Sequence, residues 1–166
     1  DFWHINALPE FGVAPIMLSD GPNGLRKISS DSKNPVKSIK TVCYPASSAT
    51  ACSWNRDAVS IIGDTLAKEC KSERVSVILG PGINTKRTPL CGRNFEYYSE
   101  DPVLSGELAA SYINAVQSEG IGTSLKHFAC NNTETKRMKS NSLVDERALR
   151  EIYLRGFEIA VKKSQP

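Results

Sequence analysis

Short apolar runs alternate with helical stretches along this chain, and this alternation restricts the possible fold more than any other feature of the sequence. The clearest run, residues 75–79, stops at a Gly-Pro-Gly turn, and a similar run at 14–18 ends in a dense cluster of turn residues. A third run covers residues 121–129. Because strands that alternate with helices pair in parallel beneath those helices, we predict an α/β fold with strands at these three places.

Three helices are predicted from apolar residues at helical spacing and from capping residues at their starts. They cover residues 55–67, 102–119 and 145–163. Asp101 stands directly before Pro102, which is the arrangement of a helix cap and a first helical residue. The first helix is expected to turn Ile61 inward. The polar stretch 27–40 is expected to form an exposed loop with no core of its own.

The length of the chain leaves two architectures open. A complete (β/α)8 barrel takes roughly 250 residues, and this chain has 166. With 40% apolar and 23% charged residues, the chain has the composition of an ordinary globular protein, and we assign residues 1–166 to one domain. The sheet is then either a small open one or part of a barrel.

Composition argues against several classes of partner. The 21 Lys and Arg residues barely exceed the 18 Asp and Glu residues and are scattered among them, which argues against nucleic acid. No window approaches the roughly 18 apolar residues of a membrane helix, and the amino end does not read as an export signal. The 5 cysteines show no C-x-x-C spacing. We therefore expect reduced thiols in the cytoplasm, no metal site and no cofactor.

Charged residues follow the predicted strands at the end where parallel α/β proteins place their functional groups. Asp20 follows the first strand, Arg93 lies in the long loop after the second, and Lys126-His127 end the third. Asp20 could instead bond its own backbone in a turn, and Arg93 could form a surface ion pair. Lys126 is harder to explain in that way, because a lysine at the end of a buried strand must find an acceptor.

No motif for a nucleophile or for a phosphate-binding loop accompanies these charged groups. A sugar hydroxyl both donates and accepts, so a carboxylate can accept from it while cationic groups donate to it, at about 1.5–3 kcal/mol for each such bond. The charged set therefore suits a neutral polyhydroxylated ligand. Its members are Asp20, Arg26, Arg93, Lys126 and His127.

Four segments, in this order, resemble the amino-terminal barrel of family 3 glycoside hydrolases. They are S-D-G-P-N-G-L-R at 19–26, G-R-N-F-E at 92–96, S-L-K-H-F-A at 124–129 and V-D-E-R-A-L-R-E-I-Y-L at 144–154. The likeness covers nearly the whole chain and is strongest to the β-glucosidase branch. The K-H-F-A segment departs from the K-H-F-P-G-H-G segment of the bacterial N-acetylglucosaminidases in that family, which also favours a glucosidase.

The resemblance implies a partial TIM-type (β/α)8 barrel and a retaining, exo-acting enzyme that removes terminal non-reducing β-D-glucosyl residues from small carbohydrates. Four residues match the family's contacts to the sugar beside the cleaved bond, and two arginines match further groups near that subsite. The implied sugar-binding residues are Asp20, Arg93, Lys126 and His127, together with Arg26 and Arg137.

The resemblance also implies that the reacting groups lie elsewhere. The family's nucleophile is an aspartate in a later S-D-W segment and its acid/base carboxylate comes later still, and neither segment is matched within residues 1–166. Retaining hydrolysis needs two carboxyl groups about 5–5.5 Å apart, so we expect residues 1–166 alone to be inactive. Asp20 keeps its matched role of holding hydroxyls and is not assigned as the nucleophile.

Two alternatives remain open at this point. The chain could be a catalytically inactive sugar-binding or structural remnant whose barrel is completed by self-association or by a partner chain. It could also be an open-sheet protein unrelated to glycosidases, in which case Asp20, Arg93 and His127 would lie on different faces.

Overall fold

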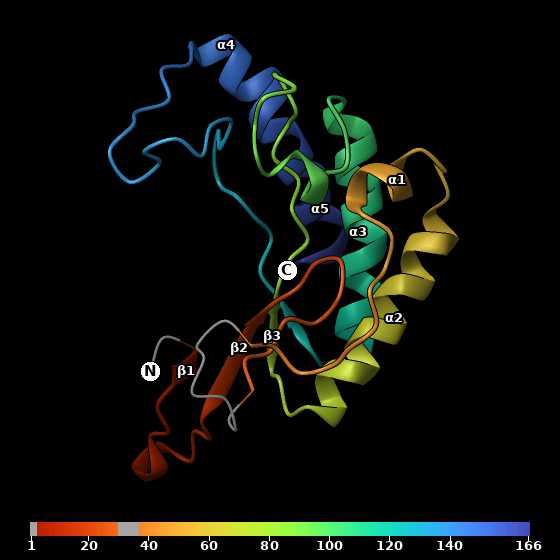
Figure 1. The fold of residues 1–166 in the computed structure, drawn as a ribbon, viewed down its shortest axis with the longest axis vertical. Helices are drawn as coiled ribbons and strands as arrows, with labels where there is room; N and C mark the ends of the chain where they lie inside the picture. Colours follow the sequence, from red (N-terminus) through yellow and green to blue (C-terminus); the bar gives the residue numbers. More distant parts are fainter. Residues whose placement is uncertain (1–2, 30–36) are drawn as a thin grey trace.

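A computed structural model describes residues 3–29 and 37–166 of the chain (Figure 1). Its strands form a sheet in the order β1-β2-β3-β4, in which β2, β3 and β4 run parallel and β1 runs antiparallel to β2. The strands are β1 (His4–Ile5), β2 (Ile16–Asp20), β3 (Val77–Leu79) and β4 (Gly122–Thr123). The predicted α/β fold with parallel strands is therefore confirmed.

The helices pack together on one side of this sheet (Figure 1). They are α1 (Ser47–Ala51), α2 (Arg56–Ser72), α3 (Pro102–Ser118), α4 (Glu146–Ala148) and α5 (Leu154–Ser164), with one π-helical turn, Leu149–Tyr153, between α4 and α5. Helix α2 connects β2 to β3, and α3 connects β3 to β4. Two successive β-α-β units whose strands lie side by side in chain order are the repeating element of a (β/α)8 barrel.

Capping residues begin the three predicted helical regions. The Asn55 side chain accepts hydrogen bonds from the backbone N–H groups of residues 57 and 58, and Asp101 does the same for residues 103 and 104. Asp145 accepts from residue 148. These bonds satisfy N–H groups that have no partner within the helix, which explains why each helix begins where the sequence predicted it.

The prediction of a long strand over residues 121–129 is wrong, since regular pairing with β3 covers only Gly122–Thr123. The chain then follows the loop after β3, where Lys126 N–H donates to the carbonyl oxygen of Pro81 at 3.0 Å. Proline has no N–H to return to the ladder, so regular pairing cannot continue past it.

Two further expectations need correction. Ile61 on α2 is 67% exposed, because the buried side of that helix is formed by Val59, Leu66 and Ala67. The stretch 27–40 is not separate from the core, since Ile39 packs against it and its N–H donates to the carbonyl oxygen of Lys27. Residues 30–36 of that stretch lie outside the described part of the chain.

Glycines allow the helices to approach closely. A Cβ at Gly63 of α2 would lie 2.8 Å from the carbonyl oxygen of Tyr112 in α3, and a Cβ at Gly106 of α3 would lie 2.8 Å from that of Gly156 in α5. The core lies between these helices and the sheet, and this packing fixes the positions of the strand ends. In the described part of the chain, no helix is long and apolar enough to cross a membrane.

Candidate functional site

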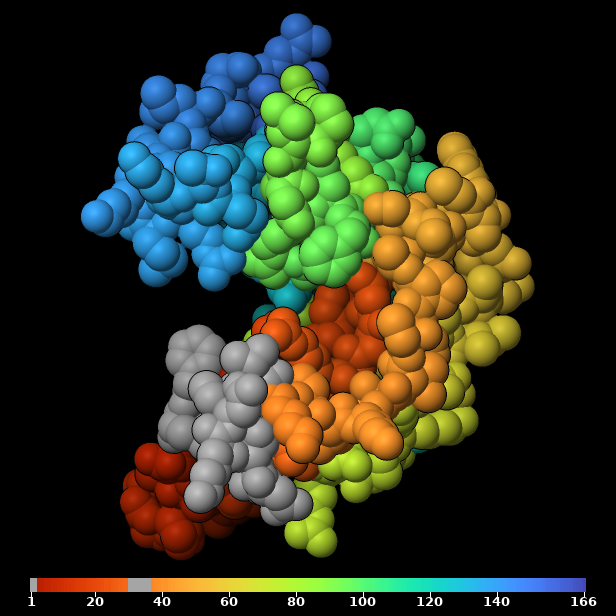
Figure 2. Space-filling model, in the orientation of Figure 1, coloured from red at the N-terminus to blue at the C-terminus, as the bar shows by residue number. Residues whose placement is uncertain are grey.

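The candidate site lies where the chain leaves the carboxyl ends of the parallel strands. Asp20 is the last residue of β2, and Lys126 follows β4. Nζ of Lys126 lies 3.4 Å from Oδ1 of Asp20, so the two strand ends meet across β3. Figure 2 shows the surface hollowed on this side, between the orange segment that follows β2 and the green loop that follows β3.

Glu96 joins this pair to Arg93. Its side chain is only 5% exposed and comes from a 3₁₀ turn over Asn94–Glu96. One carboxylate oxygen lies 3.4 Å from Nζ of Lys126, and the other accepts a hydrogen bond from Nε of Arg93. A buried carboxylate is costly unless cations and hydrogen bonds compensate it, and here two cations do so.

The charges continue to alternate beyond Arg93. Nη1 of Arg93 lies 3.9 Å from one oxygen of Glu134, and the other oxygen of Glu134 accepts a 2.6 Å hydrogen bond from Arg137. Burial alone would raise the pKa of Glu134, but hydrogen bonds from Asn131 and Arg137 outweigh burial and lower it. The result is a charge chain of three acids and three cations. In spatial order, this charge chain consists of Asp20, Lys126, Glu96, Arg93, Glu134 and Arg137.

His127 lies beside this charge chain as a neutral imidazole. Burial, followed by the positive charges of Arg93 and Lys126, lowers the pKa of His127 to about 4. Its Nδ1 lies 2.7 Å from the hydroxyl oxygen of Tyr97. Burial raises the pKa of Tyr97 to about 12, so this hydroxyl keeps its proton at neutral pH.

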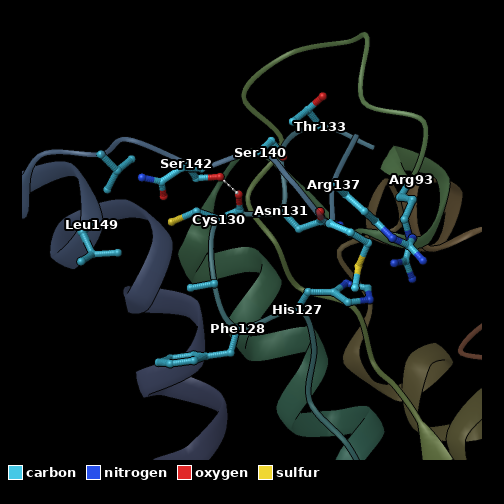
Figure 3. A pocket seen from close by; sticks show the side chains of 14 residues that line it. Arg93, His127, Phe128, Cys130, Asn131, Thr133, Arg137, Ser140, Ser142 and Leu149 are labelled. Atoms are coloured by element: carbon cyan, nitrogen blue, oxygen red, sulfur yellow. Dashed lines mark hydrogen bonds between the residues drawn. The ribbon is translucent and has the colours of Figure 1, made fainter. Parts of the chain in front are cut away.

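A cavity of about 670 Å³ borders these groups and is lined in part by Arg93, His127 and Arg137. Figure 3 shows these three side chains on the same side of the cavity, whereas Phe128 points away from them toward the helices. The ring of Phe128 meets the ring of Phe157 in α5 edge to face, with centroids 5.2 Å apart. Successive residues after β4 therefore serve the site and the helix packing in turn.

The structure brings together five of the six predicted site residues: Asp20, Arg93, Lys126, His127 and Arg137. Arg26 joins them only through its backbone, whose N–H donates to the carbonyl oxygen of Asp20 at 2.8 Å. Its side chain borders a second cavity of about 630 Å³, together with Met17 and Glu73. These positions test placement only, and the binding roles of the six residues stay predictions.

The alternatives to a shared site fare differently. Asp20 pairs with a lysine from a distant segment, so a local turn does not account for it. Arg93 does form an ion pair, as the alternative proposed, but its partner Glu96 is buried rather than on the surface. The alternative in which Asp20, Arg93 and His127 lie on different faces is wrong, because the contacts of Lys126 and Glu96 link them.

Sequence reasoning assigned no role to four residues that complete the site: Glu96, Tyr97, Asn131 and Glu134. None of them directly follows a strand, which is where the candidates were sought. One local signal was present, since Glu96 follows Arg93 by three residues, a spacing at which opposite charges in a tight turn can pair.

The arrangement offers donors and acceptors in close alternation. Asp20 is 40% exposed and can accept from a ligand, while Lys126, Arg93 and His127 can donate. Hydrogen bonds to charged groups are stronger than those between neutral groups, so the site is suited to bind hydroxyl groups. Within residues 3–29 and 37–166, no three His, Cys, Asp or Glu side chains are placed to hold a metal ion.

Comparison with known proteins places this site in a family. Residues 31–165 match the family model described as the glycosyl hydrolase family 3 N terminal domain. The thermostable beta-glucosidase B of Acetivibrio thermocellus is 54% identical over 100% of this chain and 22% of its own length. An exo-alpha-(1->6)-L-arabinopyranosidase of Bifidobacterium longum is 47% identical over the same shares.

Solved structures agree in fold. Beta-glucosidase 3B from Thermotoga neapolitana, in complex with glucose, superposes with a TM-score of 0.90 at 50% identity, over 98% of this chain and 23% of its own. The Kluyveromyces marxianus beta-glucosidase, also with glucose, gives a TM-score of 0.92 at 42% identity, over 100% and 19%. The chain thus spans about a fifth of the length of these relatives. It folds as part of a TIM-type (β/α)8 barrel and belongs to glycosyl hydrolase family 3, within the N-terminal domain of that family.

Proposed function

We propose that the protein carrying this chain is a retaining, exo-acting β-glycosidase of the β-glucosidase type, and that residues 1–166 supply much of its sugar-binding pocket. The observation that carries this proposal is the charge chain from Asp20 to Arg137 beside a neutral imidazole. Such a set grips neutral hydroxyl groups through charge-assisted bonds without requiring a charged ligand.

Each group has a distinct role in this proposal. Asp20 accepts from hydroxyls of the terminal sugar, and Lys126 donates to them while remaining paired with Glu96. Arg93 and His127 donate from the loop after β3 and from the segment after β4. Because Glu96 holds both Lys126 and Arg93, the donors are fixed in position before the sugar arrives, which lowers the entropic cost of binding.

The reacting carboxylates are proposed to lie outside residues 1–166. Asp20, Glu96 and Glu134 are each paired with cations, which suits binding and leaves none of them as a free acid for protonating a leaving group. A retaining mechanism requires a carboxylate nucleophile and a separate acid/base about 5–5.5 Å apart. β4 is the last strand of the described sheet, which supports completion of the barrel by further strands of the same protein or of a partner chain.

The names of the relatives guide the choice of substrate. They include beta-glucosidases and exo-alpha-(1->6)-L-arabinopyranosidases, so a terminal β-D-glucosyl group is our first candidate and a terminal α-L-arabinopyranosyl group is the one to test beside it. Both are neutral pyranoses. The free cysteines support a reducing compartment such as the cytoplasm.

The test uses the full-length protein with aryl β-D-glucoside and aryl α-L-arabinopyranoside, in the wild type and in Asp20→Asn and Lys126→Met. We expect the wild type to hydrolyse at least one substrate and to release the sugar with its anomeric configuration retained, as followed by NMR. In both variants we expect kcat/KM to fall by a factor of about 100 or more, which corresponds to roughly 3 kcal/mol. A surface variant, Lys162→Met, serves as the control.

Two outcomes would count against the proposal. Hydrolysis that survives in Asp20→Asn and Lys126→Met would show that these groups do not hold the reacting sugar. Binding of glucose to the full-length protein without any hydrolysis would favour the inactive sugar-binding alternative instead.

A further inference from the structure

The hydroxyl of Tyr97 connects two parts of the site. Its oxygen lies 2.7 Å from Nδ1 of His127 and accepts a 2.8 Å hydrogen bond from Nδ2 of Asn131. The same Nδ2 donates to Oε1 of Glu134 at 2.9 Å. Glu134, Asn131, Tyr97 and His127 therefore form one hydrogen-bonded series that leads from a carboxylate to an imidazole.

Asn131 is held rigidly within this series. The side chain of Asn84, which is buried in the loop after β3, donates to the carbonyl oxygen of Asn131 at 2.9 Å and accepts from its N–H at 2.9 Å. With its backbone bonded on both sides, Asn131 can present its amide group in only a narrow range of directions.

The carboxylate sets the direction of every bond in the series. An ionised carboxylate can only accept, so the Asn131 group that faces Glu134 must be its NH₂ and not its carbonyl oxygen. That NH₂ has two hydrogens, one for Glu134 and one for the oxygen of Tyr97. Glu134 is kept ionised by Arg137, which donates to its other oxygen at 2.6 Å.

Tyr97 passes this direction on to His127. Tyr97 is fully buried, so its single proton must find an acceptor inside the protein. Among the described residues, Nδ1 of His127 is the acceptor within hydrogen-bond distance, since Asn131 already donates to Tyr97. A neutral imidazole whose Nδ1 accepts carries its proton on Nε2.

We propose that Tyr97, held by Asn131, is a positioning residue that fixes His127 as its Nε2–H tautomer, so that the imidazole donates a hydrogen bond to a hydroxyl of the bound sugar. His127 lines the 670 Å³ cavity, and no described residue accepts from its Nε2. The last step rests on the function proposed above, whereas the tautomer is a property of the unliganded protein. A hydroxyl that accepts from His127 is then required at one ring position of the substrate.

The first experiment measures the tautomer directly and needs no sugar. Full-length protein labelled with ¹⁵N-histidine is studied by NMR at neutral pH, and the His127 signals are identified by their loss in His127→Gln. We expect Nε2 to be protonated and Nδ1 to be unprotonated. A protonated Nδ1 in the wild-type protein would overturn the proposal, and this measurement does not depend on the folding of any Tyr97 variant.

The second experiment removes the hydroxyl. Tyr97→Phe is compared with Tyr98→Phe, in which the altered residue is the neighbouring buried tyrosine that has no contact with His127. We expect both tautomers of His127 in Tyr97→Phe and the wild-type tautomer in Tyr98→Phe. If the two tautomers become equally populated, affinity for glucose falls by about 2-fold from the population alone, and further if the ring also rotates. An unchanged single tautomer in Tyr97→Phe would contradict the proposal.

Substrate analogues connect the tautomer to the sugar. Glucosides with one hydroxyl replaced by fluorine, which can accept but not donate, are compared with those carrying hydrogen at the same position. We expect one ring position at which wild type and Tyr98→Phe prefer fluorine and Tyr97→Phe shows no preference. A preference that persists in Tyr97→Phe would count against the proposal. If no sugar binds to any of these proteins, the proposed function fails while the NMR result still decides the tautomer.

Discussion

Nζ of Lys126 lies 3.4 Å from Oδ1 of Asp20, although 106 positions separate the two residues in the sequence. The contact exists because β2 and β4 flank β3 in register, with Asp20 opposite Leu79 and Thr123 opposite Ile78. The sheet thus places a carboxylate and an ammonium group at adjacent strand ends. The site depends on the strand order, and the strand order depends on the two β-α-β units.

Replacing Lys126 by methionine is expected to destabilise the fold as well as to abolish sugar binding. The side chain is only 13% exposed, and its loss leaves Glu96 buried with one cation instead of two. Removing one partner of a buried ion pair typically costs about 3–5 kcal/mol. Denaturant unfolding of the full-length protein measures this loss.

The matched control is Lys162→Met on the exposed face of α5, where Lys162 pairs with Glu158. This pair lies in solvent, so little change in stability is expected. Equal losses of stability in the two variants would contradict the structural role assigned to Lys126.

Glu96→Gln is expected to weaken substrate binding while preserving the fold. The glutamine keeps the shape of the side chain, but its NH₂ group must face one of the two cations, so Lys126 or Arg93 loses its acceptor. We expect KM to rise about 10-fold, which corresponds to about 1.4 kcal/mol. Steady-state kinetics measures it, and Glu151→Gln on an exposed helical surface is the control. An unchanged KM would show that Glu96 does not position the donors.

The helices could be predicted because their signals are local. Asn55, Asp101 and Asp145 each cap a helix through residues two or three positions away, so the necessary information lies within a few residues. The strand after α3 was predicted too long because its end depends on Pro81, which lies on a neighbouring segment. The apolar run itself carries no sign of that interruption.

The site divides in the same way. Asp20 and Lys126 could be predicted because they follow apolar runs, and the ends of parallel strands meet at one edge of the sheet. Glu96, Tyr97 and Asn131 lie in loops, and their contacts depend on how those loops fold back over the strand ends. No spacing rule relates Tyr97 to Asn131, although their side chains are hydrogen-bonded.

Gly106→Ala is expected to destabilise the protein by separating α3 from α5. A Cβ at this position would lie 2.8 Å from the carbonyl oxygen of Gly156, and backbone atoms cannot move aside as a flexible side chain can. Overpacking of this kind costs about 1–3 kcal/mol, beyond the gain in helix propensity of about 1 kcal/mol from alanine.

The control for this prediction is Gly92→Ala. The nearest atom to a Cβ at Gly92 is Cγ of Glu134 at 3.9 Å, an ordinary contact, so little change is expected. Thermal unfolding of both variants measures the difference. A Gly106→Ala variant as stable as the wild type would show that the two helices do not approach as closely as described.

The low pKa of His127 makes part of the stability of the fold dependent on pH. Burial, with Arg93 and Lys126, lowers this pKa to about 4, whereas an unfolded histidine titrates near about 6.5. Between these values the unfolded chain binds a proton that the folded protein does not, so the free energy of unfolding rises with pH. The contribution is complete above about pH 6.5 and is lost as the pH falls toward about 4, with a slope of at most about 1.4 kcal/mol per pH unit. Unfolding midpoints of wild type and His127→Gln across this range test the prediction: the advantage of the wild type should shrink as the pH falls, and a difference that does not vary with pH would contradict it.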